Sequence, residues 1–139
     1  MDPVALLNSC KTVVVYGAST NPEKPAHYVP RYMQEHGFHI IPVNPSATEI
    51  FGETCYPSLA AIPAEKLAGG WILNVFRLSV ETPEIIAKAL PIPQLRAVWL
   101  QEGITTTAAA RAAIPGAVTL IESTCMLKAH RDQGQCQAH

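Results

Sequence analysis

Five short runs of mostly apolar residues recur along the chain and predict β-strands. They cover residues 12–16, 39–43, 71–76, 97–100 and 118–121. In the first run, Val13, Val14 and Val15 follow one another. A strand with one solvent-exposed face would instead alternate apolar and polar residues. Continuous β-branched runs of this kind are typical of strands covered on both sides, as in a parallel sheet.

Segments with helix start and stop signals lie between these runs. They cover residues 4–9, 25–36, 82–90, 105–114 and 125–130. Asp2 and Thr82 are each followed by proline, which fits an N-cap residue before a proline at the first helical position. Gly37 is placed to end the second helix. Pro30 lies inside that helix, so it either kinks the helix or moves the true start to a later residue.

The order of these elements predicts an α/β fold. Strands and helices alternate, which implies parallel strands, right-handed crossovers and a doubly wound sheet of about five strands flanked by helices. The polar segment 46–63 interrupts the alternation, with a short extended piece expected near Ile50 and a turn of helix near Leu59. Residues 1–130 are expected to form one domain, and residues 131–139 a polar C-terminal tail.

Composition and charge narrow the function classes. The chain has 139 residues, 48% hydrophobic and 15% charged, with a formal net charge of −1. This balance gives no general attraction to nucleic acid or to an acidic membrane, so we expect neither as a partner. The four cysteines are widely spaced and form no Cys-x-x-Cys pair, which argues against a zinc site or a disulfide framework. Without a signal-peptide pattern at the N-terminus, the chain is expected to be cytoplasmic.

Candidate binding residues follow the strands. In an open parallel sheet, ligands bind beyond the carboxyl ends of the strands, where the strand order reverses. After the first strand, Gly17 permits a sharp turn, and Ser19, Thr20 and Asn21 add hydrogen-bonding side chains before a helix begins. Free amides at a helix start suit a phosphate. The alternative is a plain strand-to-helix turn, because the loop matches neither Gly-x-Gly-x-x-Gly nor a P-loop.

The end of the second predicted strand lacks an acidic residue, which bears on the type of nucleotide. Dinucleotide-binding domains place an acidic residue at the end of the second strand, where it binds the ribose hydroxyls. Here Val43, Asn44 and Pro45 occupy that place, and the first acid beyond them is Glu49. This lowers the case for NAD and favours a nucleotide whose ribose is modified or faces elsewhere.

Several short motifs occur together in order from Thr12 to His130. They are Val-Tyr-Gly-Ala-Ser (15–19), Asn-Pro (21–22), Lys-Pro (24–25), Ile-Pro-Val-Asn-Pro (41–45), Cys-Tyr-Pro-Ser-Leu (55–59), Asn-Val-Phe-Arg (74–77), Val-Trp-Leu-Gln (98–101), Glu-Gly-Ile (102–104), Cys125 and His130. Together they resemble the small Rossmann-type CoA-binding proteins related to the CoA-binding domain of the succinyl-CoA synthetase alpha subunit.

The resemblance implies a coenzyme A or acyl-CoA site. It places the pyrophosphate on Gly17, Ala18 and Ser19 and the adjoining helix start. It places the adenosine near Asn44, Pro45, Phe76 and Arg77, and the pantetheine arm near Gln101 and Gly103. Lys24 or Arg77 would pair with the 3′-phosphate.

The sequence departs from the family pattern at several positions. The family has aspartate where Asn74 stands, Asp-Arg where Ser123 and Thr124 stand, and glutamate where Ala129 stands. These departures leave two interpretations of Cys125, a thiol that meets CoA or a small buried hydrophobic residue. Pro30 is expected to interrupt a helix that is unbroken in the family.

We interpret the chain as a binding or regulatory module rather than a complete enzyme, because no catalytic constellation is visible. The related synthetases need further domains, so catalysis would require a partner protein; a homo-oligomer is also compatible with the sequence. The alternatives are an NAD(P)-binding oxidoreductase-like domain and an interaction protein whose nucleotide pocket has degenerated.

Overall fold

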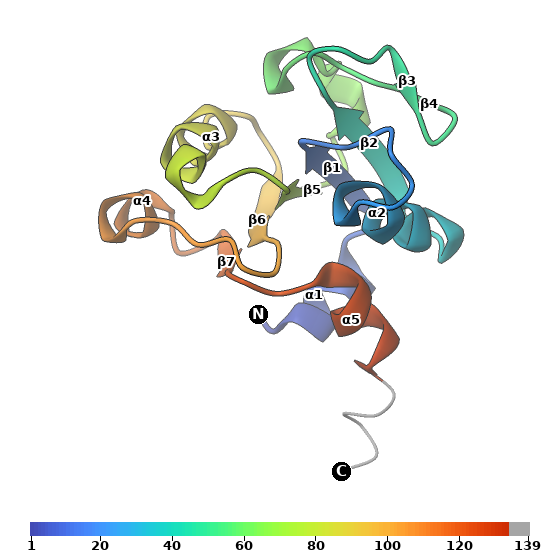
Figure 1. Cartoon of the computed structure of the whole chain (residues 1–139). Helices are drawn as coiled ribbons and strands as arrows, with labels where there is room; N and C mark the ends of the chain where they lie inside the picture. The colour runs from blue at the N-terminus through green and yellow to red at the C-terminus, as the bar shows by residue number, and fades with distance from the viewer. Residues whose placement is uncertain (134–139) are drawn as a thin grey trace.

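A five-stranded parallel sheet forms the centre of the molecule in the computed structural model, which describes residues 1–133 (Figure 1). Its strands are β1 (Thr12–Tyr16), β2 (His39–Val43), β5 (Trp71–Val75), β6 (Leu95–Leu100) and β7 (Thr119–Ile121). Their spatial order is β2-β1-β5-β6-β7, and every neighbouring pair is parallel. The predicted α/β fold with a parallel sheet of about five strands is confirmed.

The apolar runs form strands because helices cover both faces of the sheet. All five residues of β5 are buried, and Val13, Val14 and Val15 of β1 are fully inaccessible to solvent. Successive side chains of these strands enter two different cores. Val13 and Val15 belong to the core beneath the helices α1 (Pro3–Ser9), α2 (Pro25–Glu35) and α5 (Met126–Arg131). Val14 belongs to the core beneath α3 (Thr82–Ala89).

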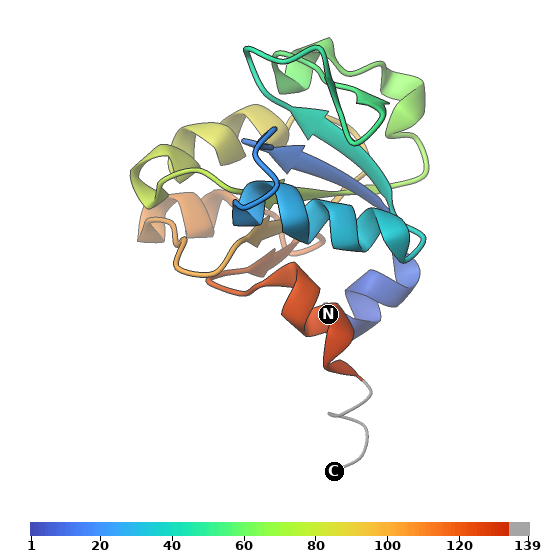
Figure 2. The ribbon, with the colours of Figure 1, turned by 45° about the vertical axis from the view of Figure 1, so that its right-hand side comes forward.

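The helices form two layers on the sheet. They are α1 (Pro3–Ser9), α2 (Pro25–Glu35), α3 (Thr82–Ala89), α4 (Ala108–Ala113) and α5 (Met126–Arg131). Helices α1, α2 and α5 lie on one side of the sheet, and α3 and α4 lie on the other (Figures 1 and 2). Buried residues such as Leu6, Met33 and Met126 anchor the first layer, and Ile85 and Ile86 anchor the second.

The segment between β2 and β5 adds short elements outside the main sheet. They are the antiparallel pair β3 (Glu49–Ile50) and β4 (Glu53–Thr54) and the 3₁₀ helices η1 (Leu59–Ala61) and η2 (Ala64–Lys66). Phe51 and Gly52 have positive φ angles at the tight turn between β3 and β4. The extended piece expected near Ile50 and the turn expected near Leu59 are both present.

Several predicted element ends were wrong. The helix expected over residues 105–114 is α4, which begins only after Thr107, whose side chain accepts from the Ala110 amide. Thr82 was expected to cap α3 from outside the helix, but it is the first residue of α3. Its hydroxyl instead contacts the carbonyls of Ser79 and Thr105 at 2.7 and 2.9 Å, because the 3₁₀ helix η3 (Ser79–Glu81) runs directly into α3.

Pro30 neither delays nor interrupts α2, which runs without a break from Pro25 to Glu35. Proline has no N–H to donate to the carbonyl four residues earlier, that of Ala26. The amide of Ser19 donates to this carbonyl at 3.1 Å. The helix therefore accommodates the proline because a neighbouring loop uses the freed acceptor. Gly37 follows the helix with φ +93°, as predicted.

The strand order reverses between β1 and β5. The chain first places β2 on one side of β1 and then crosses to place β5, β6 and β7 on the other. The carboxyl ends of β1 and β5 therefore flank the switch point, which is where ligands bind in doubly wound sheets.

Candidate functional site

A pocket of about 330 Å³ opens at the carboxyl ends of β2 and β1, beside the switch point. It is lined by Tyr16, Gly17, Val43, Asn44, Pro45, Pro57, Arg77 and Glu81. Four of the predicted binding residues meet here, although they come from three different loops. We call this the β1–β2 pocket.

Gly17 shapes the pocket through its backbone. Its φ of +89° lies in the region that residues with a side chain rarely adopt. A Cβ atom at this position would lie 2.9 Å from Cδ of Arg77 and 3.3 Å from the carbonyl oxygen of Phe76. The Arg77 side chain therefore packs directly over Gly17, and no larger residue fits without a shift.

The loop after β1 is held by its own amides. Gly17 and Ala18 both donate to the carbonyl of Val43, at 3.0 and 3.2 Å, and Ser19 donates to the carbonyl of Ala26. These three amides were expected to face a phosphate, but each already has a partner. Within residues 1–133, the nearby amides without a hydrogen-bond partner are those of Thr20 and Ala26.

Two of the predicted polar side chains in this loop have structural contacts. The Ser19 hydroxyl accepts from the amide of Asn21, and the Asn21 side-chain oxygen accepts from the amide of Glu23, each at 3.0 Å. Both bonds fold the loop into tight turns before α2. The exposed side chains of Thr20 and Lys24 make no such bond within the part of the chain that the structure describes.

Asn44 links the two loops that border the β1–β2 pocket. Its side-chain nitrogen donates to the carbonyl of Ala18 at 2.8 Å, and its side-chain oxygen accepts from the amide of Ser46 at 2.7 Å. Asn44 therefore holds the end of β2 against the loop after β1. Its neighbour Pro45 is exposed and lines the pocket mouth.

Arg77 and Glu81 form a bidentate ion pair at this pocket. Nε and Nη2 of Arg77 donate to the two carboxylate oxygens of Glu81 at 3.2 and 3.0 Å. Sequence reasoning missed Glu81, because it looked for an acid only after β2. The separation of four residues between an arginine and a glutamate, just beyond a strand end, was the available signal.

Three more of the predicted residues line two other pockets. Phe76 and Gly103 border one of about 300 Å³ at the ends of β5 and β6, which also shares Arg77. Gln101 borders another of about 390 Å³ between α2 and α5, together with Cys125 and Lys128. Arg77 thus lines both the β1–β2 pocket and the pocket at the ends of β5 and β6, and the predicted residues that line pockets are spread over three of them rather than one.

A buried polar pair lies beneath this region. Asn74 is 1% exposed, and its side-chain nitrogen reaches the carbonyl of Trp99 at 3.2 Å and Oε1 of Gln101 at 3.5 Å. Oε1 of Gln101 also accepts from the amide of Met126 at 3.2 Å. Gln101 therefore fixes the start of α5, while Oδ1 of Asn74 has no partner among residues 1–133.

The residues at which the C-terminal segment departs from the family pattern make local contacts. Ser123 adopts a positive φ of 48°, and its hydroxyl accepts from the amide of Gly103 at 3.0 Å. The carbonyl of Thr124 accepts from Nε1 of Trp99 at 2.8 Å. Cys125 is buried with a free thiol at the start of α5. Ala129 packs at the edge of the core beneath α1, α2 and α5.

His130 belongs to an aromatic cluster between α2 and α5. Its Nδ1 lies 2.9 Å from the Tyr32 hydroxyl, and its ring meets those of His36 and Phe38 edge-on. Burial, and then the nearby His36 and Lys11, hold the pKa of His130 below its ordinary value of 6.5. The described residues 1–133 contain no group of three or more His, Cys, Asp or Glu placed to hold a metal ion.

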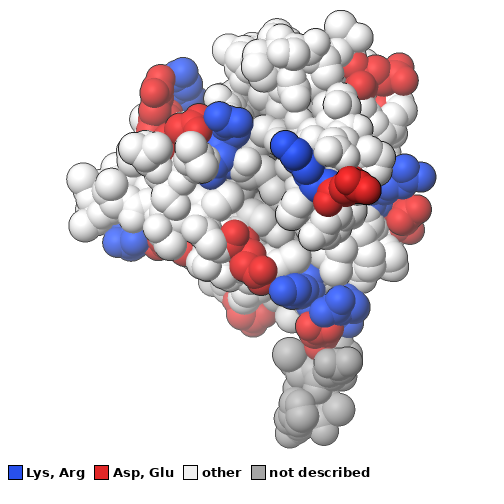
Figure 3. All heavy atoms as spheres, in the orientation of Figure 1, with Lys and Arg blue, Asp and Glu red and all other residues white. Residues whose placement is uncertain are grey.

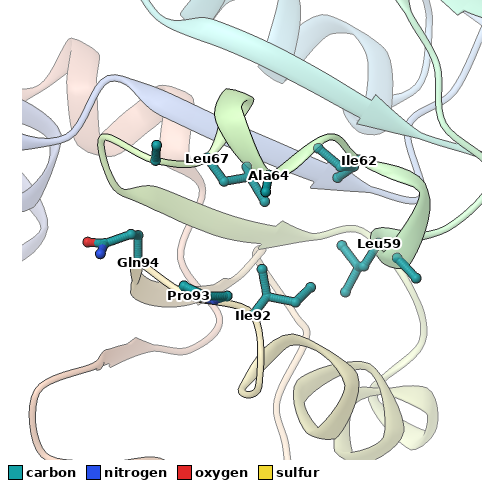
Figure 4. Close-up of a pocket in the computed structure, with 9 residues that line it drawn as sticks. Leu59, Ile62, Ala64, Leu67, Ile92, Pro93 and Gln94 are labelled. Carbon is teal, nitrogen blue, oxygen red and sulfur yellow. The ribbon is translucent and has the colours of Figure 1, made fainter.

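An apolar pocket of about 350 Å³ lies at the opposite end of the sheet (Figure 4). Its labelled residues come from the segment around η1 and η2 and from the turn before β6; they are Leu59, Ile62, Ala64, Leu67, Ile92, Pro93 and Gln94. It contains none of the predicted binding residues. On the face in Figure 3, acidic and basic side chains are interspersed without a continuous basic patch.

The sheet order and the pocket at its switch point define a doubly wound, Rossmann-like α/β protein. Residues 11–131 match the CoA binding domain family, and the chain belongs to that family. The family resemblance predicted from the sequence motifs is thereby confirmed.

Two related sequences and one solved structure are similar to this chain and support its assignment to the family. YneT of Bacillus subtilis (strain 168), an uncharacterized protein, is 32% identical over 127 residues, covering 90% of this chain and 89% of YneT. A segment of the acetate–CoA ligase [ADP-forming] II of Archaeoglobus fulgidus is 33% identical over 96 residues, covering 68% of this chain but 12% of the ligase. The structure of cell-free ID.343 from Thermus thermophilus has a TM-score of 0.81 at 33% identity, covering 94% of this chain and 98% of that one.

None of the helices within residues 1–133 has both the length and the apolar character needed to cross a lipid bilayer.

Proposed function

We propose that the protein binds coenzyme A or an acyl-CoA and acts as a binding or regulatory module. The observation that carries the proposal is the β1–β2 pocket: it lies at the switch point, and its glycine wall at Gly17 leaves no room for a Cβ. Membership of the CoA binding domain family supports the choice of ligand.

The residues present fit such a cofactor. We assign the adenosine to the β1–β2 pocket, between Asn44, Pro45 and Arg77. The pyrophosphate is assigned to the free amides of Thr20 and Ala26 with Lys24 beside them, since these groups lie where α2 begins. When bound, the cofactor would supply an acyl-carrying thiol.

The pantetheine arm is assigned to the pockets that follow along the ends of β5 and β6. These pockets carry Phe76, Gly103 and Gln101, and the second also reaches the free thiol of Cys125. The three described cysteines are free and buried.

We propose binding without turnover. The A. fulgidus ligase is far longer than this chain, and its activity belongs to the whole protein. We further propose that any reaction of a CoA ester held here uses groups from a partner protein.

One observation favours an NAD(P)-binding alternative. The carboxylate of Glu81 lines the β1–β2 pocket, so an acid is present near the proposed ribose position although none follows β2. Its pairing with Arg77 neutralises that acid, which is why CoA is preferred.

Calorimetric titration with CoA, acetyl-CoA, NAD and NADP separates these functions. We expect CoA and acetyl-CoA to bind and the dinucleotides to bind more weakly. Binding of NAD but not CoA would overturn the proposal, and failure of every nucleotide at millimolar concentration would favour an interaction protein with a degenerate pocket. Native mass spectrometry of the purified protein provides an independent check through a co-purifying CoA species.

A further inference from the structure

We propose that Arg77 and Glu81 form a subsite for a phosphate monoester on the ribose, in which the Glu81 carboxylate holds the guanidinium until a phosphate replaces it. The inference rests on the proposed CoA function and adds a residue that sets which nucleotides the β1–β2 pocket prefers.

The geometry of the pair fits an exchangeable anion. The two parallel N–H···O bonds from Arg77 to Glu81 use the fork that arginine presents equally well to a carboxylate or a phosphate. The Glu81 carboxylate therefore occupies the position that an incoming phosphate would take. Both side chains line the pocket, so the exchange would happen inside it.

A contact other than the ion pair with Glu81 holds the Arg77 side chain in place. Its Cγ and Cδ atoms lie against Gly17, only 3.1 and 2.9 Å from where a Cβ would be. The backbone of Glu81 is held separately, because its amide donates to the carbonyl of Leu78, the residue before η3. The guanidinium thus stays at the pocket whichever anion it binds.

The strength of the pair permits the exchange. The side chains of Arg77 and Glu81 are 49% and 36% exposed, and ion pairs at this exposure are weak. A phosphate monoester carries nearly two negative charges at neutral pH and offers three acceptor oxygens, so it outcompetes a single carboxylate. A ligand without that phosphate gains no ion pair with Arg77, since Glu81 stays in place.

The position of the pair favours the ribose phosphate over the pyrophosphate. The groups assigned to the pyrophosphate, at Thr20, Lys24 and Ala26, do not line the β1–β2 pocket. Arg77 and Glu81 line it together with Asn44 and Pro45, where the adenosine is assigned. In CoA the monoester is on the 3′ position of that ribose.

The test compares CoA with 3′-dephospho-CoA, two ligands that differ only in this phosphate. Calorimetry at one fixed salt concentration gives Kd for both ligands with the wild type, Glu81→Gln and Arg77→Gln. We expect Glu81→Gln to tighten CoA by about three- to fivefold, the range that an exposed ion pair supports, and to leave dephospho-CoA unchanged. Arg77→Gln should weaken CoA until the two ligands bind alike.

Glu84→Gln is the matched control. It removes the same charge from another exposed pair with a four-residue separation, Glu84 with Lys88 at 3.1 Å, outside the pocket. We expect it to leave the ratio of the two Kd values as in the wild type. A Glu84→Gln effect equal to that of Glu81→Gln would overturn the subsite in favour of net charge.

The outcomes separate the two proposals. If the wild type binds neither ligand, the CoA function fails and the subsite fails with it. If the wild type binds CoA but Glu81→Gln leaves the ratio unchanged, the subsite alone is overturned. If Arg77→Gln weakens both ligands equally, Arg77 contacts a group that CoA and dephospho-CoA share, which also overturns the subsite.

Discussion

The amide of Ser19 and the carbonyl of Ala26 are joined by a 3.1 Å hydrogen bond, which ties the loop after β1 to the first turn of α2. The acceptor is available because Pro30, four residues on, has no N–H to offer it. The proline inside α2 thus leaves an acceptor for the Ser19 amide, so this amide of the candidate phosphate loop is not free.

Replacing Pro30 with alanine should loosen that loop. Pro30→Ala supplies an amide that competes for the Ala26 carbonyl, so we expect hydrogen exchange at Ser19 to accelerate by about tenfold. Exchange measured by NMR reports this directly. The Gly17 amide, which donates to Val43, serves as the internal control. Unchanged protection at Ser19 would show that the loop does not depend on the proline.

Replacing Gly17 with alanine should destabilise the fold and abolish CoA binding. The positive φ alone costs about 1–3 kcal/mol for a residue with a Cβ, and the contact with Arg77 adds to it. Urea denaturation measures the loss. In an Arg77→Ala background the contact is removed while the φ strain remains, so the effect of Gly17→Ala should become smaller. Equal losses in both backgrounds would exclude the contact as a cause.

Restoring the family's aspartate at position 74 should destabilise this chain. The carboxylate of Asn74→Asp would face the Trp99 carbonyl and Oε1 of Gln101, both acceptors, at a site that is 1% exposed. We expect a loss of about 3 kcal/mol near neutral pH, which urea denaturation measures. Burial would raise the carboxyl pKa, so the loss should shrink as pH falls toward the unfolded value of about 4.

Asn74→Leu is the control for that variant. It removes the same hydrogen bonds without adding a titratable group, so its stability loss should not change over the acidic range. A loss in Asn74→Asp that is equally independent of pH would contradict a buried charge as the cause.

Protonation of His130 should weaken the contact between α2 and α5. Because its folded pKa lies below 6.5, the unfolded chain takes up a proton that the folded chain resists. The free energy of unfolding should therefore fall as pH drops below about 6.5, until the folded pKa is reached. Urea midpoints at about pH 7.5 and about pH 5.5 measure this change, which should be smaller in His130→Gln. Identical pH dependence in both proteins would rule out His130 as the source of the change in stability.

The strands could be predicted from the sequence because both faces of the sheet are buried. Runs such as Trp71–Val75 then need no polar alternation, and their apolar character is visible without any tertiary information. The start of α3 could not be predicted in this way. The Thr82 hydroxyl bonds the carbonyl of Thr105, 23 residues away, and that contact overrides the local capping signal.

The candidate site was predictable only in part. Gly17, Asn44, Pro45 and Arg77 follow strand ends, and a parallel sheet brings those ends to one edge. Which amides stay free depends on contacts between separate segments, such as Gly17 with Val43. Glu81 was missed for a different reason, because an acid was sought only at the end of β2, whereas Glu81 lies four residues after Arg77 in η3.

Two carbonyls, those of Val43 and Ala26, hold three consecutive amides of the loop after β1. A segment fastened at both ends has already given up its conformational freedom before any ligand arrives. Ligand binding at this loop should then resemble docking onto a rigid surface, with no slow conformational step in the association kinetics. The heat capacity of binding should accordingly scale with the apolar area covered by the ligand, without a contribution from folding of the protein.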